Sequence, residues 1–295
     1  MDQKLWGVLK PILLRVARST PRLPRSCYSD YLILRLYFWA VLHDRPMSWA
    51  IEPTHYNCIF RPRQWPSVSQ LNRRIASGRF TQMLKRVHEL FRGDALAKMY
   101  TAYLDGKALL LSPVTTDQEA TAGRIPGGFA KGYKLHALVD QSLQIPVFCV
   151  LPLNCHEQTA AHALLDQLQQ LPRTLLLADT NYDSDKLYTQ VHDKGGRLLT
   201  PLRGRATHPT TLSQMGSTRK QMIQFWNRRP AQMNRIYQKR KTIERVFSRL
   251  ACTPGLLGHL PTFIRGLKRV ERWVRAKICL YHARLRITPE TKTKV

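Results

Sequence analysis

Two aspartates stand at positions where a carboxylate is costly unless it binds a partner. Asp105 interrupts the apolar run 99–111, whose composition predicts a strand, and an unpaired carboxylate buried there would be unfavourable. Asp179 ends the run Leu175–Ala178, which is typical of a buried parallel strand. Ligand sites in open α/β sheets form beyond the carboxyl ends of such strands. Simpler interpretations remain open, because Asp105-Gly106 is a common turn dipeptide and Asp179 could cap a helix.

A third acid, Glu244, lies in a strongly basic segment. In the pattern Tyr237-x2-Arg240-x3-Glu244, the three side chains share one face if residues 234–250 form the helix that we predict there. Glu244 either pairs with Arg240, four residues earlier, or completes a metal site with the two aspartates while its basic neighbours hold a DNA backbone. The basic neighbours are Lys239, Arg240, Lys241, Arg245 and Arg249.

The elements that would carry these acids change character near residue 99. Residues 1–98 read as helical, with apolar residues at helical spacing over 80–92. Beyond them the order strand, strand, strand, helix, strand, helix, strand matches an α/β, ribonuclease-H-like core: a mixed sheet with flanking helices. The predicted strands are 99–111, 132–140, 145–153, 173–179 and 197–202, and the predicted helices are 157–171 and 184–194.

That layout makes the first and fourth strands neighbours, so Asp105 and Asp179 would stand side by side. Two adjacent carboxylates repel each other unless a divalent cation lies between them. Hard oxygen ligands and a phosphate substrate indicate Mg²⁺ or Mn²⁺. Residues 203–233 are polar and are predicted to be an irregular insertion, and residues 263–285 form a further basic helix.

The charge of the chain points to a polyanionic partner. Lys and Arg total 47 against 19 acids, a net charge of +28. Residues 1–98 carry +11, residues 99–200 carry −2 and residues 201–295 carry +19. Basic flanks of this size would neutralise phosphates of nucleic acid, or they are solvated helix faces. A membrane partner is not expected, because the apolar run 31–42 contains Arg35 and is too short to span a bilayer. The six cysteines show no zinc spacing and indicate reduced thiols in the cytosol.

Taken together, the motifs resemble those of the DDE transposases of bacterial insertion sequences. The resemblance covers about residues 99–285. It rests on Leu104-Asp105-Gly106-Lys107, Lys131-Gly-Tyr-Lys-Leu-His136, Asn154-Cys-His156-Glu157, Ala178-Asp179-Thr-Asn-Tyr182-Asp183-Ser184 and Tyr237-x2-Arg240-x3-Glu244-Arg-x-Phe. Two positions depart from the family pattern: Ala251 stands where a Lys usually follows the Glu, and Asn181 stands where Gly is frequent.

The resemblance implies that Asp105, Asp179 and Glu244 are the catalytic acids and hold Mg²⁺ or Mn²⁺, two ions in all. It implies cleavage of transposon ends by water and joining of the freed 3′-OH to target DNA. Tyr237 and Arg240 would grip the phosphate near the scissile bond, and the predicted DNA-binding residues are Tyr237, Arg240, Lys241, Arg245 and Arg249. His136 and His156 could approach the site, and the resemblance implies that Trp226 could stack on an unpaired base, but structural roles are the simpler interpretation for all three.

The expected partners are double-stranded DNA, as element ends and target, and a second copy of the chain in a homodimer on DNA. We expect a cytoplasmic, nucleoid-associated bacterial protein. The predicted domains are a helical DNA-binding domain over 1–98, a catalytic domain over 99–285 and a basic tail over 286–295. Two alternatives share these features: a nuclease that only hydrolyses DNA, and a non-catalytic repressor that binds element ends.

Overall fold

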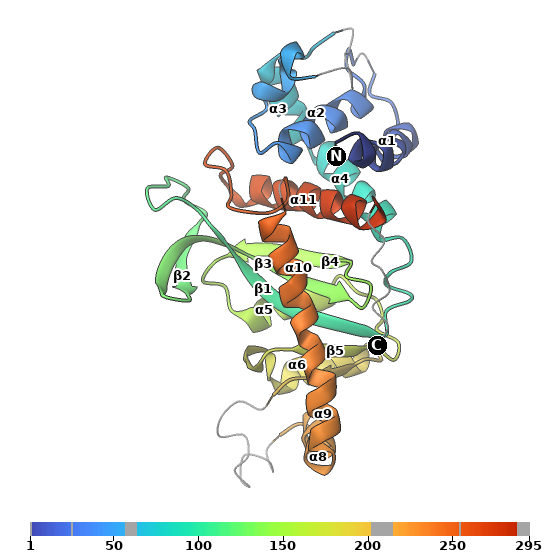
Figure 1. Cartoon of the computed structure of the whole chain (residues 1–295), viewed down its shortest axis with the longest axis vertical. Coiled ribbons are helices and arrows are strands. Elements are labelled where there is room, and N and C mark those ends of the chain that lie inside the picture. Colours follow the sequence, from blue (N-terminus) through green and yellow to red (C-terminus); the bar gives the residue numbers. More distant parts are fainter. Residues whose placement is uncertain (1, 25, 57–63, 202–214, 254, 288–295) are drawn as a thin grey trace. The chain divides into compact units, whose positions relative to one another are not determined.

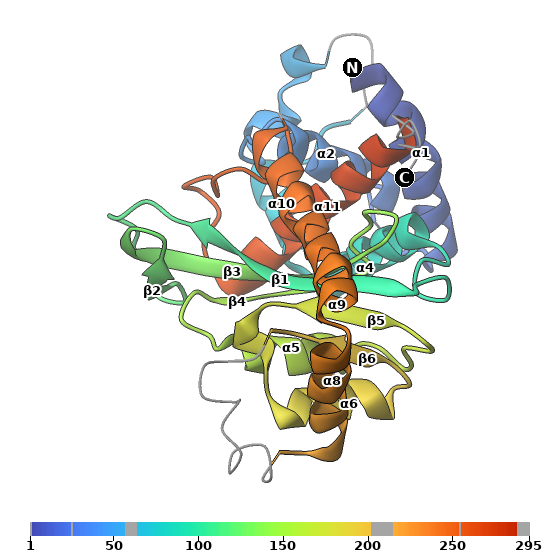
Figure 2. The same ribbon diagram turned by 60° about the horizontal axis from the view of Figure 1, so that its bottom comes forward.

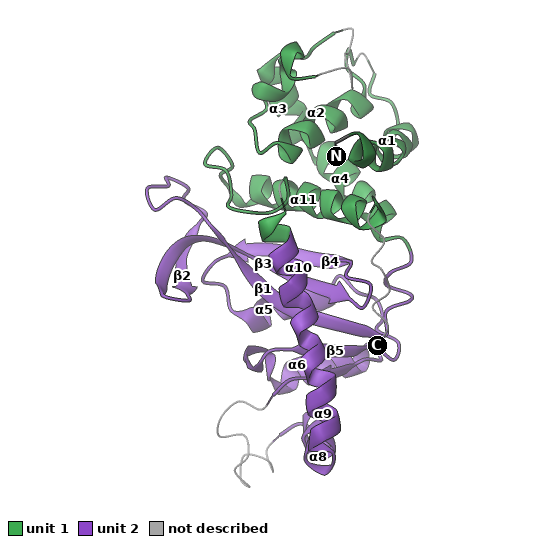
Figure 3. Cartoon of the chain, viewed as in Figure 1, with its two compact units in different colours: residues 1–93, 250–295 green, residues 94–249 purple. Residues whose placement is uncertain are grey.

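A computed structural model describes residues 2–24, 26–56, 64–201, 215–253 and 255–287. The chain divides into two compact units, which Figure 3 distinguishes by colour. Unit 1 comprises Met1–Gly93 and Leu250–Val295, and unit 2 comprises Asp94–Arg249. The division near residue 94 lies close to the predicted domain boundary, whereas residues 250–285 group with the N-terminal helices instead of the catalytic domain. The predicted tail, 288–295, lies outside the described residues.

Unit 1 is helical. Its elements are α1 (Asp2–Ser19), α2 (Asp30–Leu42), η1 (Trp49–Ile51), η2 (Pro53–His55), α3 (Val68–Ala76), α4 (Gly78–Arg92) and α11 (Leu267–Ile287). Serines begin three of these helices: Ser29 caps α2, Ser67 forms a capping box with Gln70 on α3, and Ser77 caps α4. The last helix, α11, contacts α1, α2 and α4. Its buried face includes Val270, Trp273 and Ile278, and this apolar face is the reason that α11 belongs to unit 1.

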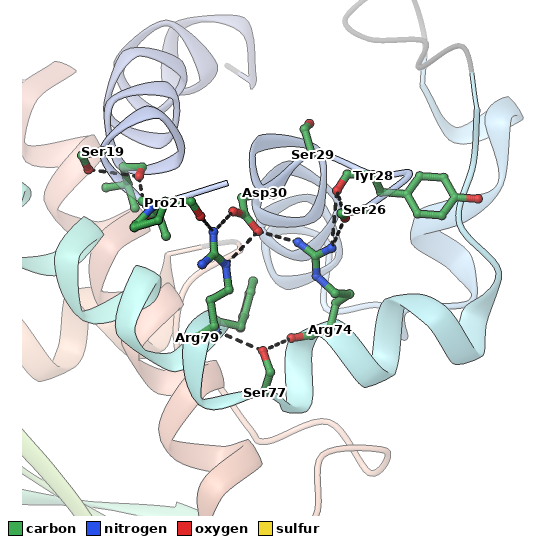
Figure 4. Close-up of polar contacts among 12 residues, drawn as sticks. Ser19, Pro21, Ser26, Tyr28, Ser29, Asp30, Arg74, Ser77 and Arg79 are labelled. Carbon is green, nitrogen blue, oxygen red and sulfur yellow. Dashed lines mark hydrogen bonds and ion pairs between the residues drawn. The ribbon is translucent and has the colours of Figure 1, made fainter. Parts of the chain in front are cut away.

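One buried carboxylate fastens the start of α2 to the turn between α3 and α4. Asp30 is 8% exposed and binds Arg74 and Arg79, each at 2.5 Å (Figure 4). Arg74 also donates to Ser26 Oγ at 2.6 Å, and Ser77 Oγ donates to the Arg74 carbonyl at 2.6 Å. Charge-assisted contacts of this kind hold segments that are more than 40 residues apart in the chain.

Unit 2 contains a six-stranded mixed sheet (Figure 1). Its strands are β1 (Thr101–Leu110), β2 (Thr121–Ile125), β3 (Gly128–Asp140), β4 (Val147–Pro152), β5 (Leu175–Ala178) and β6 (Arg197–Leu199). β3 pairs antiparallel with β1, β2 and β4, whereas β5 pairs parallel with β1 and β6. The pairing of β3 with β4 and of β1 with β5 agrees with the ribonuclease-H-like core that the sequence predicts. The short strand β2 is an addition that we did not predict.

Two helices, α5 and α6, cover one face of the sheet. α5 (Glu157–Leu165) contacts β3 and β4, and α6 (Asp185–Asp193) contacts β6. A buried cluster fills this face and includes Leu104, Leu138, Leu164, Leu176 and Tyr188. The segment α8 (Ser217–Arg228), α9 (Pro230–Tyr237), η5 (Gln238–Arg240) and α10 (Lys241–Cys252) forms a helical rod beside the strands, as Figure 2 shows. The segment approaches β1 at the turn between α9 and α10, where Arg240 binds Asp105.

The predicted irregular insertion over 203–233 is wrong for its second half. Helix α8 begins at Ser217 and α9 begins at Pro230, while residues 202–214 lie outside the described part of the chain. Ile223 and Met233 are buried and anchor these two helices. That segment has few apolar residues, so the sequence shows no helical spacing of apolar side chains from which the two helices could be predicted. None of the described helices is long and apolar enough to cross a membrane.

Candidate active site

Strand register brings the two aspartates together. β1 and β5 run parallel with Leu104 opposite Ala178, so Asp105 and Asp179 are the next residues on neighbouring strands. Asp105 continues β1, and its Oδ1 accepts a hydrogen bond from the Gly106 amide at 2.8 Å. Asp179 follows β5, and its Oδ1 accepts from the Thr180 amide at 2.7 Å, which caps the turn η3 (Thr180–Tyr182). Asp179 therefore caps a helical turn and also lies close enough to Asp105, in the central strand β1, for its charge to act on that carboxyl group.

Arg240 joins the third acid to this pair. Its Nη1 lies 3.0 Å from Asp105 Oδ2, and its Nη2 lies 3.0 Å from Glu244 Oε1. The Arg240 side chain is 18% exposed, against 23% for that of Asp105 and 54% for that of Glu244. A short 3-10 turn, Gln238–Arg240, separates α9 from α10, so the predicted continuous helix is interrupted at this point. The spacing of Arg240 and Glu244 still places both on one side of the rod.

The groups around Asp105 have opposing effects on its pKa. Burial raises the pKa of Asp105, and the neighbouring carboxylates of Asp179 and Glu157 add to that effect, while the Gly106 amide and Arg240 oppose it. Burial lowers the pKa of Arg240, but the carboxylates of Asp105, Asp179 and Glu244 outweigh burial and the pKa is raised. The guanidinium is thus the local counter-ion of a cluster with excess negative charge.

Tyr237 lies at the end of α9 beside the same charges. Burial raises its pKa, and Asp179 and Asp105 contribute, while Arg240 opposes the rise. The Tyr237 ring lies 5.7 Å from the ring of Trp226 on α8. Trp226 is therefore packed against an aromatic neighbour that is itself close to the acids.

Comparison with known proteins decides the family. The family model described as the transposase DDE domain matches residues 104–281. The chain belongs to this family. Among solved structures, it is similar to a piggyBac transposase in a synaptic complex with hairpin DNA, at 10% identity over 99% of this chain and 81% of that chain. The TM-score is 0.37, so the fold assignment rests on the sheet topology and not on this likeness. The comparison with curated proteins gives no match.

The donor set of this DDE transposase has the chemistry of a Mg²⁺ or Mn²⁺ site, since hard cations prefer carboxylate oxygens. Asp105 and Asp179 are adjacent, but Arg240 lies between Asp105 and Glu244. In the part of the chain that the structure describes, no three acidic, His or Cys side chains are grouped closely enough to hold an ion. In chemical type the carboxylates suit such an ion, and in this arrangement Arg240 occupies one oxygen of Asp105 and one of Glu244.

The remaining predicted DNA-binding residues lie on the outer side of α10. Lys241, Arg245 and Arg249 are exposed. Arg245 donates to Thr242 Oγ1 at 3.1 Å, which holds its guanidinium close to the helix. Their contact with DNA stays a prediction.

Sequence reasoning missed a second ion pair near the acids. Lys134 Nζ lies 2.5 Å from Glu157 Oε1. Both residues stand in motifs that carried the family resemblance, but nothing in the sequence showed that they meet. His136, on the same face of β3 as Lys134, is fully buried, and burial lowers its pKa to about 3. An imidazole with so low a pKa is a weak base. His156, by contrast, is exposed at the start of α5.

Proposed function

We propose that this DDE transposase cleaves the ends of a bacterial insertion sequence and joins them to target DNA through Asp105, Asp179 and Glu244. The observation that supports it best is the gathering of three acids around one guanidinium. Residues from a strand, a strand end and a helix, 139 positions apart at the extremes, lie around Arg240 beyond the carboxyl end of β5. Such a cluster has no structural necessity, because two adjacent carboxylates repel each other.

The reaction is phosphoryl transfer in two displacements at phosphorus. In the first, a water oxygen forms a bond to the phosphorus at the element end, and the bond to the 3′ oxygen breaks, leaving a 3′-OH and a 5′-phosphate. In the second, that 3′-OH forms a bond to a phosphorus of the target and displaces the target's own 3′ oxygen. Two Mg²⁺ or Mn²⁺ ions, if held by the three carboxylates, would lower the pKa of the attacking hydroxyl group and stabilise the negative charge on the leaving oxygen.

The chain's own groups position the DNA for these steps. Asp105 and Asp179 provide the rigid part of the site, because both are tied to backbone amides at the sheet edge. Arg240 is the group closest to the acids that can donate two parallel hydrogen bonds to a phosphate once it releases Asp105 and Glu244. Tyr237 lines the same space, and Lys241, Arg245 and Arg249 would contact the backbone further along α10.

The rest of the chain supplies DNA affinity in this proposal. The segment 1–98 has a net charge of +11, and segment 201–295 has +19, which suits the backbone of double-stranded DNA. Arg73 on α3 is exposed, whereas Arg74 and Arg79 are engaged by Asp30. We further propose that the transposase acts as a homodimer that holds two element ends, in the bacterial cytoplasm on the nucleoid.

The test uses a plasmid that carries a pair of element ends, with Mg²⁺ or Mn²⁺. The wild-type chain should release end fragments and give strand-transfer products. Asp105→Asn, Asp179→Asn and Glu244→Gln should each lower cleavage by about 100-fold or more, while end binding changes little. Asp193→Asn, an exposed acid on α6, is the matched control and should cleave normally.

Three outcomes would contradict the proposal in different ways. Persistent cleavage by purified Asp105→Asn protein would show that Asp105 is not a catalytic acid. Cleavage by the wild type without any joined product would indicate a nuclease that only hydrolyses DNA. Binding to element ends without metal-dependent nicking would indicate a repressor.

A further inference from the structure

The hairpin formed by β2 and the start of β3 extends one end of the sheet as a two-stranded arm, residues 121–131 (Figure 1). Strand pairing between β1 and β3 ends at Leu110 and Gly132, and β2 is the one described strand that pairs with residues 128–131. Pro126 and Gly127 form the turn, and the φ of 89° at Gly127 suits a type II turn. The outer part of the arm is therefore a ribbon only two strands wide.

The base of the arm is fixed to the segment that follows β4. Thr121 Oγ1 donates a hydrogen bond to Asn154 Oδ1 at 2.9 Å, and the Asn154 amide donates to Thr121 Oγ1 at 3.2 Å. A Cβ on Gly123 would lie 2.7 Å from Leu153 Cγ and 2.9 Å from the Leu153 carbonyl oxygen, so the missing side chain allows β2 to pack this closely. These contacts fix the direction of the arm, while residues 126–129 at its turn are exposed.

The long polar and aromatic side chains of the arm lie on one of its faces. Phe129 stands opposite Arg124 in the β2–β3 pair, and Lys131 is two residues from Phe129 on the same face. On the other face, Gly123 stands opposite Ala130. Phe129 is 79% exposed, and Arg124 is exposed beside it. The arm thus offers an aromatic ring between two cationic side chains.

The charge and shape of the arm suit double-stranded DNA. Residues 120–139 include three basic residues, Arg124, Lys131 and Lys134, and no acid, although segment 99–200 as a whole has a net charge of −2. A two-stranded β-ribbon fits the major groove of B-DNA, where apolar side chains contact base edges and cationic ones contact phosphates. DNA therefore matches the arm in both charge and width.

The strand register places the arm on the side of the sheet where the acids lie. Asp105 stands opposite Ala137, and Phe129 is eight residues from Ala137 along β3, so Asp105 and Phe129 belong to the same face. β5 runs parallel to β1 and ends beside Leu104, so the arm projects beyond the carboxyl end of β5. Eight residues of a strand extend about 26 Å, which corresponds to about 8 base pairs of B-DNA.

We propose that the arm binds the duplex of the element end about 8 base pairs from the scissile phosphate, with Phe129 in a groove and Arg124 and Lys131 at the phosphates beside it. This inference rests on the proposed function of the acid cluster. By holding the duplex at a fixed distance from Asp105, the arm would help to set which phosphate lies over the acids.

The first test measures the affinity for end DNA by fluorescence anisotropy, without metal, between about 50 and 200 mM salt. Arg124→Gln and Lys131→Gln should each reduce the slope of log Kd against log salt concentration by about 1, because each removes one phosphate contact. Phe129→Ala should weaken binding by about 10-fold with an unchanged slope, since an apolar contact releases no counterions.

Two exposed side chains away from the arm provide matched controls. Lys186→Gln changes a lysine on α6, which packs on the other face of the sheet, and Tyr100→Ala changes a ring that is 64% exposed at the opposite end of β1. Both should bind end DNA with the affinity and salt slope of the wild type. Wild-type affinity and slope in all three arm variants would overturn the inference.

Hydroxyl-radical footprinting of end DNA locates the contact. The wild type should protect a stretch centred about 8 base pairs from the cleavage position. The triple variant Arg124→Gln/Phe129→Ala/Lys131→Gln should lose this protection and keep the protection at the cleavage position. Unchanged protection in the triple variant, or a loss centred on the cleavage position, would contradict the proposed place of the arm.

Other outcomes separate the arm from a protein interface and from the proposed function. If Phe129→Ala converts a dimer to a monomer without DNA and keeps the wild-type affinity and footprint, the arm is a contact between copies and the inference is wrong. A wild type that cleaves, together with arm variants that bind normally, rejects the arm alone. A wild type that neither binds nor cleaves end DNA rejects the proposed function and this inference with it.

Discussion

At the scale of single residues, the most informative group is Arg240. It spans 135 residues of sequence to bind Asp105 and four residues to bind Glu244, at 3.0 Å in each case. Both acids that it holds are proposed metal ligands. A guanidinium and a divalent cation cannot occupy the same carboxylate oxygens together, so we expect Arg240 to compete with a bound metal ion in the absence of DNA.

This competition predicts that Arg240→Gln binds Mn²⁺ more tightly without DNA. Partly exposed ion pairs contribute about 1 kcal/mol, and loss of such a competitor corresponds to about a 5-fold gain in affinity. Isothermal titration calorimetry of the DNA-free protein measures the change. Arg235→Gln, which alters an exposed arginine on α9, is the control and should leave the affinity unchanged. Unchanged or weaker binding of Mn²⁺ to Arg240→Gln would contradict the competition.

The residue scale also shows what sequence alone could predict. The pairing of Asp105 with Asp179 followed from strand order, because neighbouring parallel strands end at one edge. For Glu244, the sequence left pairing with Arg240 and membership of a metal site open, and the pairing is present. The ion pair of Arg240 with Asp105 depends on how the helical rod packs against the sheet, and no local sequence pattern predicts that packing. The position of the Lys134 stem over Gly106 depends on the missing side chain of that glycine, which no local pattern in the sequence indicates.

At the scale of elements, the hairpin β3–β4 fixes the strand that carries Lys134 and pairs with β1. Asp140 ends β3, and its Oδ1 accepts from the amides of Ser142 and Gln144 at 2.9 and 2.8 Å. The turn includes Leu143 with a φ of 63°. Asp140 is 1% exposed, and burial raises its pKa to about 6, although the two amides oppose the rise.

The hairpin therefore predicts a pH dependence of stability. The pKa of Asp140 is about 6 in the folded chain against 3.8 for an ordinary aspartate, so its contribution is fully present below pH 3.8 and is lost as the pH rises through 6. Asp140→Asn keeps the Oδ1 acceptor and cannot ionise. Its melting temperature should exceed that of the wild type by about 3 °C at pH 7.5 and by less at pH 5.

Differential scanning fluorimetry across pH 4.5–8 measures that difference. Asp193→Asn, which changes an exposed acid, should give a constant offset from the wild type over the same range. An Asp140→Asn curve that runs parallel to the wild-type curve would show that the Asp140 carboxyl does not ionise over this range, contrary to the prediction.

Elements with a strong hydrophobic pattern were predicted from sequence, and weakly patterned ones were not. The run 99–111 and the alternation over 132–140 correspond to β1 and β3. β2 was missed because Thr121–Ile125 has a glycine and an arginine in a five-residue strand, with too few side chains to show a period. The end of β3 that pairs with β2 was missed for the same reason.

At the scale of the whole molecule, the charge pattern follows the proposed division of labour. The near-neutral segment 99–200 contains Asp105 and Asp179 in the sheet, and the basic segments on either side of it in the chain account for the net charge of +28. The grouping of residues 250–287 with the N-terminal helices was not predictable from composition, since α11 reads simply as another basic helix. Its apolar face becomes informative only when α1, α2 and α4 are known to be its neighbours.

The most direct test of the central claim is a crystal structure of the full chain soaked with Mn²⁺, read from the anomalous scattering of the metal. We predict a manganese peak in contact with the carboxylates of Asp105 and Asp179, with Arg240 turned away and Glu244 within reach of the ion. Manganese bound only elsewhere, with Arg240 still bridging Asp105 and Glu244 at a Mn²⁺ concentration that supports cleavage, would contradict it.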